Sequence, residues 1–341
     1  MAPPSSVLST TLRLLRDKLV DNSFLSHPLF RAIESAGNLV RVNGGSRIDE
    51  PVIFGDHTTI TELTGAGFNP VSMAVTDPFN QAKFEFANFT QPVILSDIER
   101  LANKGDLAVV NILESKVNNV MLSLKKEVSQ QVIAGDSSSI SSFETLNGMG
   151  TASVSAVGTG WFESALPTAQ ANVVGTLAKT TYRSQNWFNQ RFDSAGTFDL
   201  SHLDNLMIQA QVYNPAGEFP DIILMSPNCF AAFQNLQQSS VRYTSSENRD
   251  SLDRDMVAMW RGARIYVEPR LGFTNAAGDV VSAYILSSSQ FRLYADTDGF
   301  FEMSDMLPVP GTATTASMVL CRMQLATGHL ASHGVLINAE A

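Results

Sequence analysis

The feature that most constrains this fold is a series of apolar residues spaced three or four apart within residues 106–135. Such spacing places side chains on one face of an α-helix. No proline interrupts the run, and Gly135 is a favourable residue at a helix end. At 1.5 Å per residue the predicted helix is roughly 40 Å long, so we interpret it as a spine for other elements. The apolar face comprises Leu107, Val110, Leu113, Val117, Val120, Leu124, Val128 and Val132.

Two runs typical of β-strands precede this helix, at residues 47–55 and 81–95. In the second run, Phe84, Phe86 and Phe89 interleave with polar residues. About 25 residues rich in glycine, threonine, asparagine and proline separate the runs, compared with about 4–6 in an ordinary connection. We therefore predict an extended two-stranded finger. Such a pair has little core of its own and needs a neighbour to pack against, which indicates assembly rather than a self-contained monomer.

The composition allows a large core but leaves a surface with few charges. Hydrophobic residues make up 44% of the 341 residues, and charged residues make up 16%. Extensive surfaces buried between subunits would explain this balance, and so would a monomer rich in uncharged polar side chains. The net charge of -10 argues against a general nucleic-acid-binding surface. It is compatible with a container whose inner wall tolerates nucleic acid.

The sequence shows no sign of export or membrane insertion. Its two cysteines, Cys229 and Cys321, are too few for a disulfide framework and indicate a reducing compartment during folding. The N-terminal residues lack the basic and apolar regions of a signal peptide. Apolar runs stay well short of the roughly 20 residues of a membrane span, so we expect no membrane contact.

The first 45 residues predict an arm. Leu12, Leu15 and Leu19 recur at helical spacing. Few basic residues accompany them, which favours docking on a partner subunit over binding to a membrane.

The second half of the chain predicts an α/β unit. A helix over residues 200–213, capped by Ser201, is expected to precede a short buried strand, after which Pro227 starts another helix. Residues 259–267 are expected to form one strand, and residues 296–299 a turn.

The order of these segments resembles that of the major capsid proteins of tailed bacteriophages, which have the Johnson fold. The resemblance covers nearly the whole chain. Five stretches are similar to family segments, and Phe188 stands where the family has arginine in a Trp-Arg-Asn-Gln motif. The stretches are Asp-Glu-Pro-Val-Ile-Phe-Gly at 49–55, Pro-Val-Ile-Leu-Ser at 92–96, Leu-Glu-Ser-Lys-Val at 113–117, Asn-Trp-Phe-Asn-Gln at 186–190, and Trp-Arg-Gly-Ala-Arg-Ile-Tyr-Val-Glu-Pro at 260–269.

This resemblance implies a mixed α+β fold in five parts. The parts are an N-terminal arm at residues 1–45, an extended finger loop at 46–93, a peripheral domain with the spine helix at 94–150, an axial domain at 151–295, and return strands to the peripheral domain at 296–341. The residues expected to mediate assembly lie on the arm, finger and spine. They are Leu12, Leu15, Leu19, Phe54, Phe84, Phe86, Phe89, Val110, Leu113 and Val117.

The resemblance also implies a structural function without catalysis or a cofactor. Copies of the chain would assemble as pentamers and hexamers into an icosahedral shell around the double-stranded DNA genome of a tailed phage. The shell would form in the host cytoplasm and persist in the virion. A portal protein, a decoration or cement protein, and packaged DNA contacted without sequence specificity would be further partners. The finger begins within about 50 residues of the N-terminus, too few for a scaffolding segment of ordinary domain size, so a separate scaffolding protein is expected.

Two other functions remain as alternatives. An encapsulin-like nanocompartment shell has the same fold and would enclose enzymes instead of DNA. A soluble α/β hydrolase would need a nucleophile, a base and an orienting acid, and no Ser-His-Asp grouping has supporting context. A lysine–asparagine cross-link, another family trait, would have only Lys83 available in the finger region. A solvated strand residue explains Lys83 better.

Two short patterns raise the question of a metal site. His329 and His333 are four residues apart, a spacing that can hold zinc on a helix, but Gly328 precedes them and the region predicts strand and turn. Asp296 and Asp298 are similar to the start of a calcium loop, but the loop lacks a distal glutamate at the required spacing. A hairpin turn explains the two aspartates. We therefore expect no metal or cofactor site.

Overall fold

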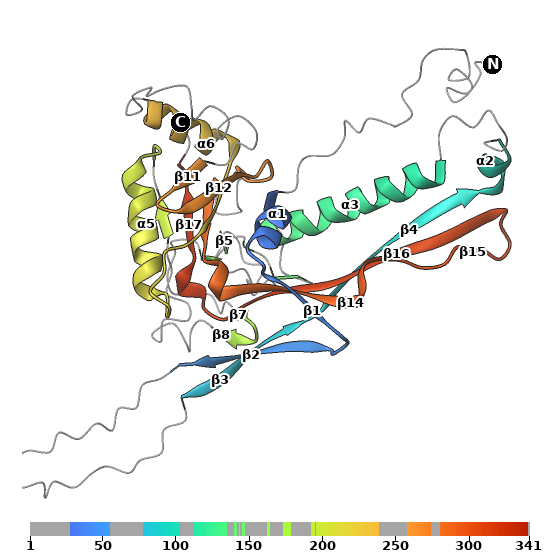
Figure 1. The fold of residues 1–341 in the computed structure, drawn as a ribbon, viewed down its shortest axis with the longest axis horizontal. Coiled ribbons are helices and arrows are strands. Elements are labelled where there is room, and N and C mark those ends of the chain that lie inside the picture. The colour runs from blue at the N-terminus through green and yellow to red at the C-terminus, as the bar shows by residue number, and fades with distance from the viewer. Residues whose placement is uncertain are drawn as a thin grey trace, which may run out of the picture.

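Two large β-sheets dominate the computed structural model, and a long helix lies along the first of them (Figure 1). The residues that this structure describes are 28–54, 78–102, 112–134, 140–141, 143, 145–146, 162–163, 173–178, 192–194, 196–238, 258–273 and 280–339.

Strand β16 (Thr314–Thr327) is the central strand of the first sheet. On one edge it pairs antiparallel with the full length of β4 (Ala87–Ser96). On the other edge it pairs with β14 (Phe291–Met303) and with the short β15 (Leu307–Pro308). β1 (Leu39–Val42) adds to β14 in parallel. Because both edges of β16 are occupied, the strand fixes how the N-terminal and C-terminal parts of the chain lie together.

Helix α3 (Ile112–Ala134) lies along this sheet (Figure 1). Leu124, Val128 and Val132, at intervals of four residues, are buried in the same hydrophobic core as β16, on the face that the periodicity predicts. The predicted helix residues before 112 and after 134 lie outside the described residues, and the role of the helix as a spine stays a prediction. Within the described ranges, no helix combines the length and the hydropathy needed to cross a membrane.

The C-terminal end of α3 is anchored to the second sheet. The hydroxyl of Tyr284 donates a hydrogen bond to the carbonyl of Ile133 at 3.2 Å. The backbone N–H of Phe143 donates to the carbonyl of Val132 at 2.6 Å, and the Phe143 ring packs on Tyr284 with centroids 5.6 Å apart. These bonds satisfy carbonyls that a helix end leaves without an intrahelical partner, so the end of α3 and the second sheet are held together.

The second sheet has the strand order β11-β12-β10-β13-β17-β9. Its strands are β9 (Phe192–Ser194), β10 (Ile222–Met225), β11 (Ala258–Trp260), β12 (Ala263–Val267), β13 (Val281–Leu286) and β17 (Gly334–Ile337).

Helices cover both faces of this sheet. α5 (Leu200–Tyr213) and α6 (Pro227–Gln238) pack on one face in a separate hydrophobic core that includes Ile223. Ile222, the preceding residue of β10, faces the other way and joins the larger core with α1 (Pro28–Ser35). Figure 1 shows α5 on the side of the sheet away from α1. Alternate residues of β10 thus belong to two hydrophobic cores, one on each face of the sheet.

One of the two predicted helix starts is confirmed and the other is corrected. Asp199, not Ser201, directly precedes α5, and its backbone is extended. Ser201 lies in the first turn and donates its hydroxyl hydrogen bond to the Asp199 carboxylate at 2.5 Å, which lowers the pKa of that carboxyl from its ordinary value. At α6, Ser226 Oγ accepts a hydrogen bond from the backbone N–H of Cys229 at 3.1 Å, and Pro227 is the first helical residue, as the sequence predicts.

Residues 259–267 form parts of two strands rather than the single strand predicted. β11 and β12 are joined by a turn at Arg261 and Gly262, whose φ angles are 47° and 87°. The carboxylate of Asp204 on α5 accepts hydrogen bonds from Arg261 Nε at 2.7 Å and from the Trp260 indole at 2.8 Å. This tertiary support stabilises an arginine in a backbone conformation that glycine or asparagine usually occupies.

The predicted turn at residues 296–299 is also wrong, because β14 continues through it. The pairing with β16 shifts register between Ala295 and Phe300, which makes this segment an irregularity within one strand. Asp296 points to β16 and forms an ion pair with Arg322 at 2.6 Å. The aspartate is therefore used for strand-to-strand contact.

The predicted strand at residues 81–95 is divided into two. β3 (Phe79–Glu85) pairs antiparallel with β2 (Arg47–Ile53), whereas β4 pairs with β16. Phe86 lies between them. The β2–β3 pair, which we call the finger pair, therefore leaves the first sheet at its base and extends away from it (Figure 1).

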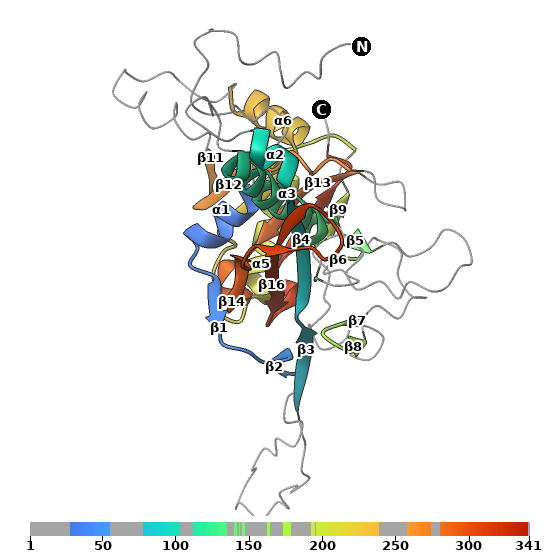
Figure 2. The same cartoon turned by 90° about the vertical axis from the view of Figure 1, so that its right-hand side faces the viewer.

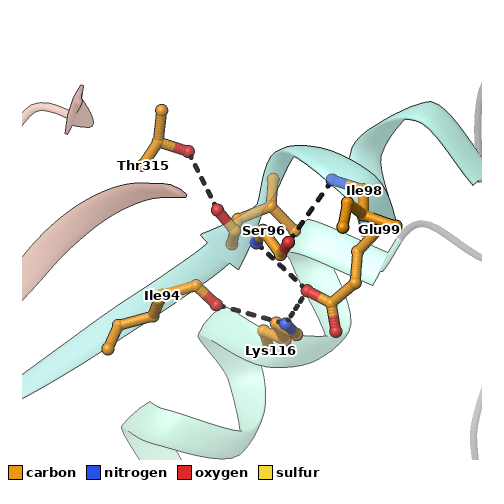
Figure 3. A network of polar contacts seen from close by, with 7 residues as sticks. Ile94, Ser96, Ile98, Glu99, Lys116 and Thr315 are labelled. Atoms are coloured by element: carbon orange, nitrogen blue, oxygen red, sulfur yellow. Dashed lines mark hydrogen bonds and ion pairs between the residues drawn. The ribbon is translucent and has the colours of Figure 1, made fainter. Parts of the chain in front are cut away.

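A polar network ties the distal end of β4 to two helices (Figure 3). Ser96 and Glu99 form a capping box at the start of α2 (Asp97–Ala102): Ser96 Oγ accepts from a first-turn N–H at 3.3 Å, and Glu99 accepts from the Ser96 N–H at 3.2 Å. Lys116 of α3 donates to Glu99 at 2.6 Å and to the carbonyl of Ile94 at 3.1 Å. The Lys116 and Ser96 bonds lower the pKa of the Glu99 carboxyl.

A buried histidine packs between the two sheets. His333 Nδ1 accepts a hydrogen bond from the backbone N–H of Ser287 at 3.2 Å, and its ring packs against Phe291 with centroids 5.9 Å apart. Burial, with a smaller contribution from His329, lowers the pKa of His333 to about 3. The imidazole is therefore neutral in the folded subunit.

We expect the folded subunit to lose stability as the pH falls below 6.5. The unfolded chain protonates His333 near pH 6.5, whereas the folded chain does so only near pH 3, so the contribution is complete above 6.5 and declines toward pH 3. At pH 5 the loss is about 2 kcal/mol. Urea denaturation of His333→Gln should show a smaller fall between pH 7 and pH 5 than wild type. The control His202→Gln should keep the wild-type fall; an equal fall in all three would contradict the prediction.

Removal of the capping hydroxyl should loosen α2 and leave α3 intact. Ser96→Ala loses the bond to the first-turn N–H of Ile98, at a local cost of about 1 kcal/mol. Amide hydrogen exchange measured at Ile98 should therefore be several-fold faster, while amides of α3 keep their protection. Thr90→Ala, a hydroxyl removal at an exposed position of β4, is the control. Unchanged exchange at Ile98 would show that the cap contributes nothing.

Candidate assembly surfaces

The finger pair has one face turned to its own subunit. Ile48 and Val52 of β2 and Ala82 and Phe84 of β3 are buried, and they belong to the same hydrophobic core as β16. They alternate with more exposed residues along each strand, as in a strand pair with one covered face. The inner face of the finger pair is therefore buried within its own subunit.

The outer face changes from charged to apolar along its length. At the base, Arg47 lies opposite Glu85 and forms an ion pair with Asp49 at 3.0 Å. At the far end of the described strands, Ile53 lies opposite Phe79, and these residues are 67% and 68% exposed. Directly opposed residues lie side by side on one face of a strand pair. The distal part of the finger pair thus presents an apolar surface that burial would stabilise.

A second apolar surface crosses three strands of the first sheet, and we call it the apolar strip. Ile94 of β4 and Leu307 of β15 lie opposite Ala316 from either side of β16. Met318 and Leu320 continue the strip along β16. Leu307 is 66% exposed and Met318 is 60% exposed. Because alternate residues of β16 are buried toward α3, the strip lies on the opposite face of the sheet.

A smaller apolar stripe lies on α5. Ile208 and Val212 are one helical turn apart and exposed, and Phe219 is exposed in the segment that follows the helix. The inward face of the same helix is buried against the second sheet. The stripe is therefore additional to what the subunit core needs.

The structure places the predicted assembly phenylalanines largely inside the subunit, with Phe84 and Phe86 near the base of the finger pair, Phe54 beyond its distal end and Phe89 on β4. Phe54 and Phe84 are buried, and Phe86 and Phe89 are partly buried against the same core. The guanidinium of Arg322 lies 4.8 Å from the centroid of the Phe86 ring. A charged substitution of Phe84 would therefore act on folding before it acts on assembly. A role of these four residues between subunits stays a prediction.

The structure describes only some of the other residues that were predicted to mediate assembly. Val117 is partly buried on α3 against the larger core. Leu113 belongs to α3, and its side chain is outside the described set. The remaining predicted residues lie outside the described residues altogether: Leu12, Leu15, Leu19 and Val110.

Sequence reasoning missed the most exposed apolar residues. A signal for Ile53 was available, because strict alternation puts it on the face opposite Val52 and Phe54. For β16 no such signal exists. Residues 316–321 are apolar on both faces except for Ser317, so the sequence does not reveal which set is covered.

The histidines and the cysteine considered as candidate functional residues make contacts within the subunit. No three histidine, cysteine, aspartate or glutamate side chains there are grouped to hold a metal ion. His329 bonds to Ser332 through Nδ1 at 2.7 Å, and His333 is buried. Burial raises the pKa of the Cys321 thiol to about 12, which disfavours the reactive thiolate. The exposed apolar surfaces described above are the candidate sites of contact with a partner.

Comparison with known proteins gives no match by sequence and clear matches by structure. No protein-family model matches the chain, and no curated protein sequence matches it. The capsid of cyanophage A-1(L) matches with a TM-score of 0.63 at 12% identity, over 98% of this chain and 99% of that one. The capsid of an empty GTA particle matches with a TM-score of 0.59 at 12% identity, over 99% and 98%.

An encapsulin matches equally completely. The SrpI encapsulin complex from Synechococcus elongatus gives a TM-score of 0.58 at 11% identity, over 100% of this chain and 97% of that one. Identity this low shows the fold alone, and the alignment extends over nearly the whole of both chains. The chain therefore has the mixed α+β Johnson fold that its segment order resembles, the fold of phage capsid proteins and encapsulins.

Proposed function

We propose that this chain is the major capsid protein of a tailed bacteriophage and assembles as pentamers and hexamers into an icosahedral shell around double-stranded DNA. The observation that carries the proposal is the match over nearly the entire chain to the capsid of cyanophage A-1(L). Because one fold can serve several functions, the proposal also draws on the surfaces that the subunit leaves uncovered.

The uncovered surfaces suit contact between copies of the chain. Ile53 and Phe79 lie on an extended strand pair, whereas Met318 and Leu307 lie on the flat face of a sheet. Contact between two different surfaces of identical subunits is heterologous, and repeated heterologous contact forms a ring when the rotation from one subunit to the next closes. The distal finger of one copy lies on the apolar strip of the next in this proposal.

The energies of such contacts are sufficient for a closed shell. Full burial of one large apolar side chain contributes about 1.5–3 kcal/mol, part of which is lost to the cost of association. Each subunit contributes a finger and receives one, so the contacts are multivalent. A closed particle is therefore stable even though each pairwise contact is weak.

The remaining partners belong to the same proposal. A separate scaffolding protein, a portal protein, a decoration or cement protein and packaged DNA are inferred from the capsid-like fold. The net charge of -10 supports few and non-specific DNA contacts. The chain acts as a structural protein without enzymatic activity, assembles in the host cytoplasm and remains in the virion.

A second candidate function is an encapsulin-like nanocompartment shell, favoured by the match to the SrpI encapsulin. Negative-stain electron microscopy of the expressed chain, alone and from infected cells, with nucleic acid assayed in the particles, separates the two. DNA-filled shells with one portal vertex support the capsid proposal. Shells that hold an enzyme support the nanocompartment. Monomers or small oligomers, even with scaffolding protein supplied, would refute both and reopen the hydrolase alternative.

Charges at the distal finger should block assembly without unfolding the subunit. In Ile53→Asp/Phe79→Asp both changes fall on exposed positions, so the thermal midpoint should shift little, while particle yield in electron micrographs falls at least tenfold. Gln234→Asp, a charge added to the exposed surface of α6, should assemble normally. Phe84→Asp should instead unfold the subunit, because the side chain is only 3% exposed. A wild-type particle yield from the double variant would exclude a contact between subunits at the distal finger.

A charge on the apolar strip should have the same effect from the receiving side. Met318→Asp places a carboxylate at a position that is 60% exposed, so the circular dichroism spectrum and thermal midpoint should stay near wild type. Buried against a neighbouring finger, the charge would lack a partner, and particle yield measured by sedimentation should fall at least tenfold. Met318→Leu, which keeps an apolar side chain of similar volume, is the control and should assemble. Normal assembly of both variants would exclude the strip as the receiving surface.

A further inference from the structure

A tight hairpin from the second half of the chain lies against the finger pair (Figure 2). It consists of β7 (Val173–Val174), β8 (Leu177–Ala178) and the turn between them. The backbone N–H of Lys83 donates a hydrogen bond to the carbonyl of Gly175 at 2.8 Å. Since β2 occupies one edge of β3, this bond lies on the other edge. The β7–β8 turn therefore covers the open edge of β3.

At Gly175 the β7–β8 turn approaches β3 so closely that there is no room for a side chain between them. A Cβ added at Gly175 would lie 2.8 Å from the Cβ of Ala82 and 3.1 Å from Cζ of Phe84. Gly175 has a φ of +57°, and Thr176 has a φ of 66°, as in the tight turns that join adjacent strands. Position 175 thus needs both a positive φ and the absence of a side chain, a combination that glycine alone meets without strain.

The turn is itself anchored in the subunit. Val174 and Leu177 lie opposite each other on the hairpin, and both are buried. They belong to the hydrophobic core that also contains Phe84 and Ala82. The hairpin is therefore joined through side chains to the core that the finger pair shares with β16.

Polar contacts hold the finger pair elsewhere. The hydroxyl of Tyr294 donates to the carboxylate of Glu50 at 2.5 Å, and Arg322 donates to the carbonyl of Gly45 just before β2. These contacts reach β2 or its approach, and long side chains can follow a moving strand by changing rotamer. Gln324 Nε2 donates to the carbonyl of Glu85 at the base of β3. The backbone contact at Gly175 is stiffer than these side-chain contacts and acts on β3 nearer to its distal end.

We propose that the β7–β8 turn is the support that sets the direction of the finger pair, with Gly175 as a positioning residue for assembly. The inference rests on the proposed function, in which the distal finger contacts another copy. Phe79 lies four residues beyond Lys83, about 13 Å along the strand. A small rotation at the support therefore displaces the apolar pair of Ile53 and Phe79 relative to the surface that receives it.

The direct test is a distance measured within the unassembled full-length subunit. Spin labels are attached at Gln81→Cys on the finger pair and Gln234→Cys on α6, both at exposed positions. The two native cysteines are buried and are blocked or replaced by serine if they react. Gly175→Ala should shift and broaden the distance distribution. The same substitution without the labels should reduce particle yield at least tenfold.

A matched control separates the close contact from backbone strain. Gly217 has a φ of +67°, and an added Cβ there would have no atom within 4 Å. Gly217→Ala should therefore carry a similar conformational cost and keep the wild-type distance and particle yield. Combining Gly175→Ala with Ala82→Gly removes the atom that would lie 2.8 Å away and should restore much of the particle yield.

If Gly175→Ala does not fold, a milder pair of variants decides the question. Val174→Ala removes two methyl groups from the anchor of the hairpin, and Val335→Ala makes the same change at an equally buried site of β17 in the second sheet. Val174→Ala should move the label distance and Val335→Ala should not. Equal distances in both variants overturn the proposal.

The other possible results each decide one part of the proposal. A folded Gly175→Ala subunit with the wild-type distance distribution would show that the β7–β8 turn does not set the direction of the finger pair, whatever the particle yield. A shifted distance with normal particle yield overturns the positioning role in assembly. A wild-type chain that forms no particles refutes the proposed function instead, and the distance measurement still decides whether the turn supports the finger pair.

Discussion

The pairing of β16 on both edges is the constraint on which the rest of the structure depends. One ladder joins it to β4, which continues from the finger pair, and the other joins it to β14, which carries β1. Segments from the N-terminal and C-terminal parts of the sequence are thereby fixed in one sheet. Contacts of this range cost loop entropy before they stabilise anything, so the sheet forms only when the larger core closes. The exposed surfaces are a consequence of that closure, because α3 covers one face of the sheet and leaves the other.

How much of the fold the sequence could predict depends on how local the cause is. The buried face of α3 at Leu124 and Val128 and the start of α6 at Pro227 follow from spacing and capping, and both were predictable. The β11–β12 turn was not, since Arg261 is held there by Asp204, a residue 57 positions away. The continuation of β14 was missed for the same reason, because Asp296 meets Arg322 across the sheet.

The candidate surfaces were less predictable than the fold. The need for a partner could be inferred from the long finger, but the residues that meet the partner could not. A phenylalanine such as Phe84 has the same apolar character whether it fills its own core or a neighbour's, and only the tertiary structure shows that it is buried. Met318 has the reverse position: it is apolar, lies on a strand whose two faces are both apolar, and is exposed. Burial between subunits leaves no separate mark in one sequence.

The bond from Lys116 to the carbonyl of Ile94 has a consequence for how subunits avoid fibres. β4 pairs with β16 on one edge, so its other edge could template an added strand. Groups two residues apart along a strand point to the same edge, which places Pro92, without an N–H, beside the carbonyl that Lys116 occupies. An incoming strand would find no donor at Pro92 and an acceptor already occupied at Ile94. Backbone ladders, which grow without limit, are thus disfavoured at this point of the edge, and contact between concentrated subunits is left to exposed side chains such as Met318.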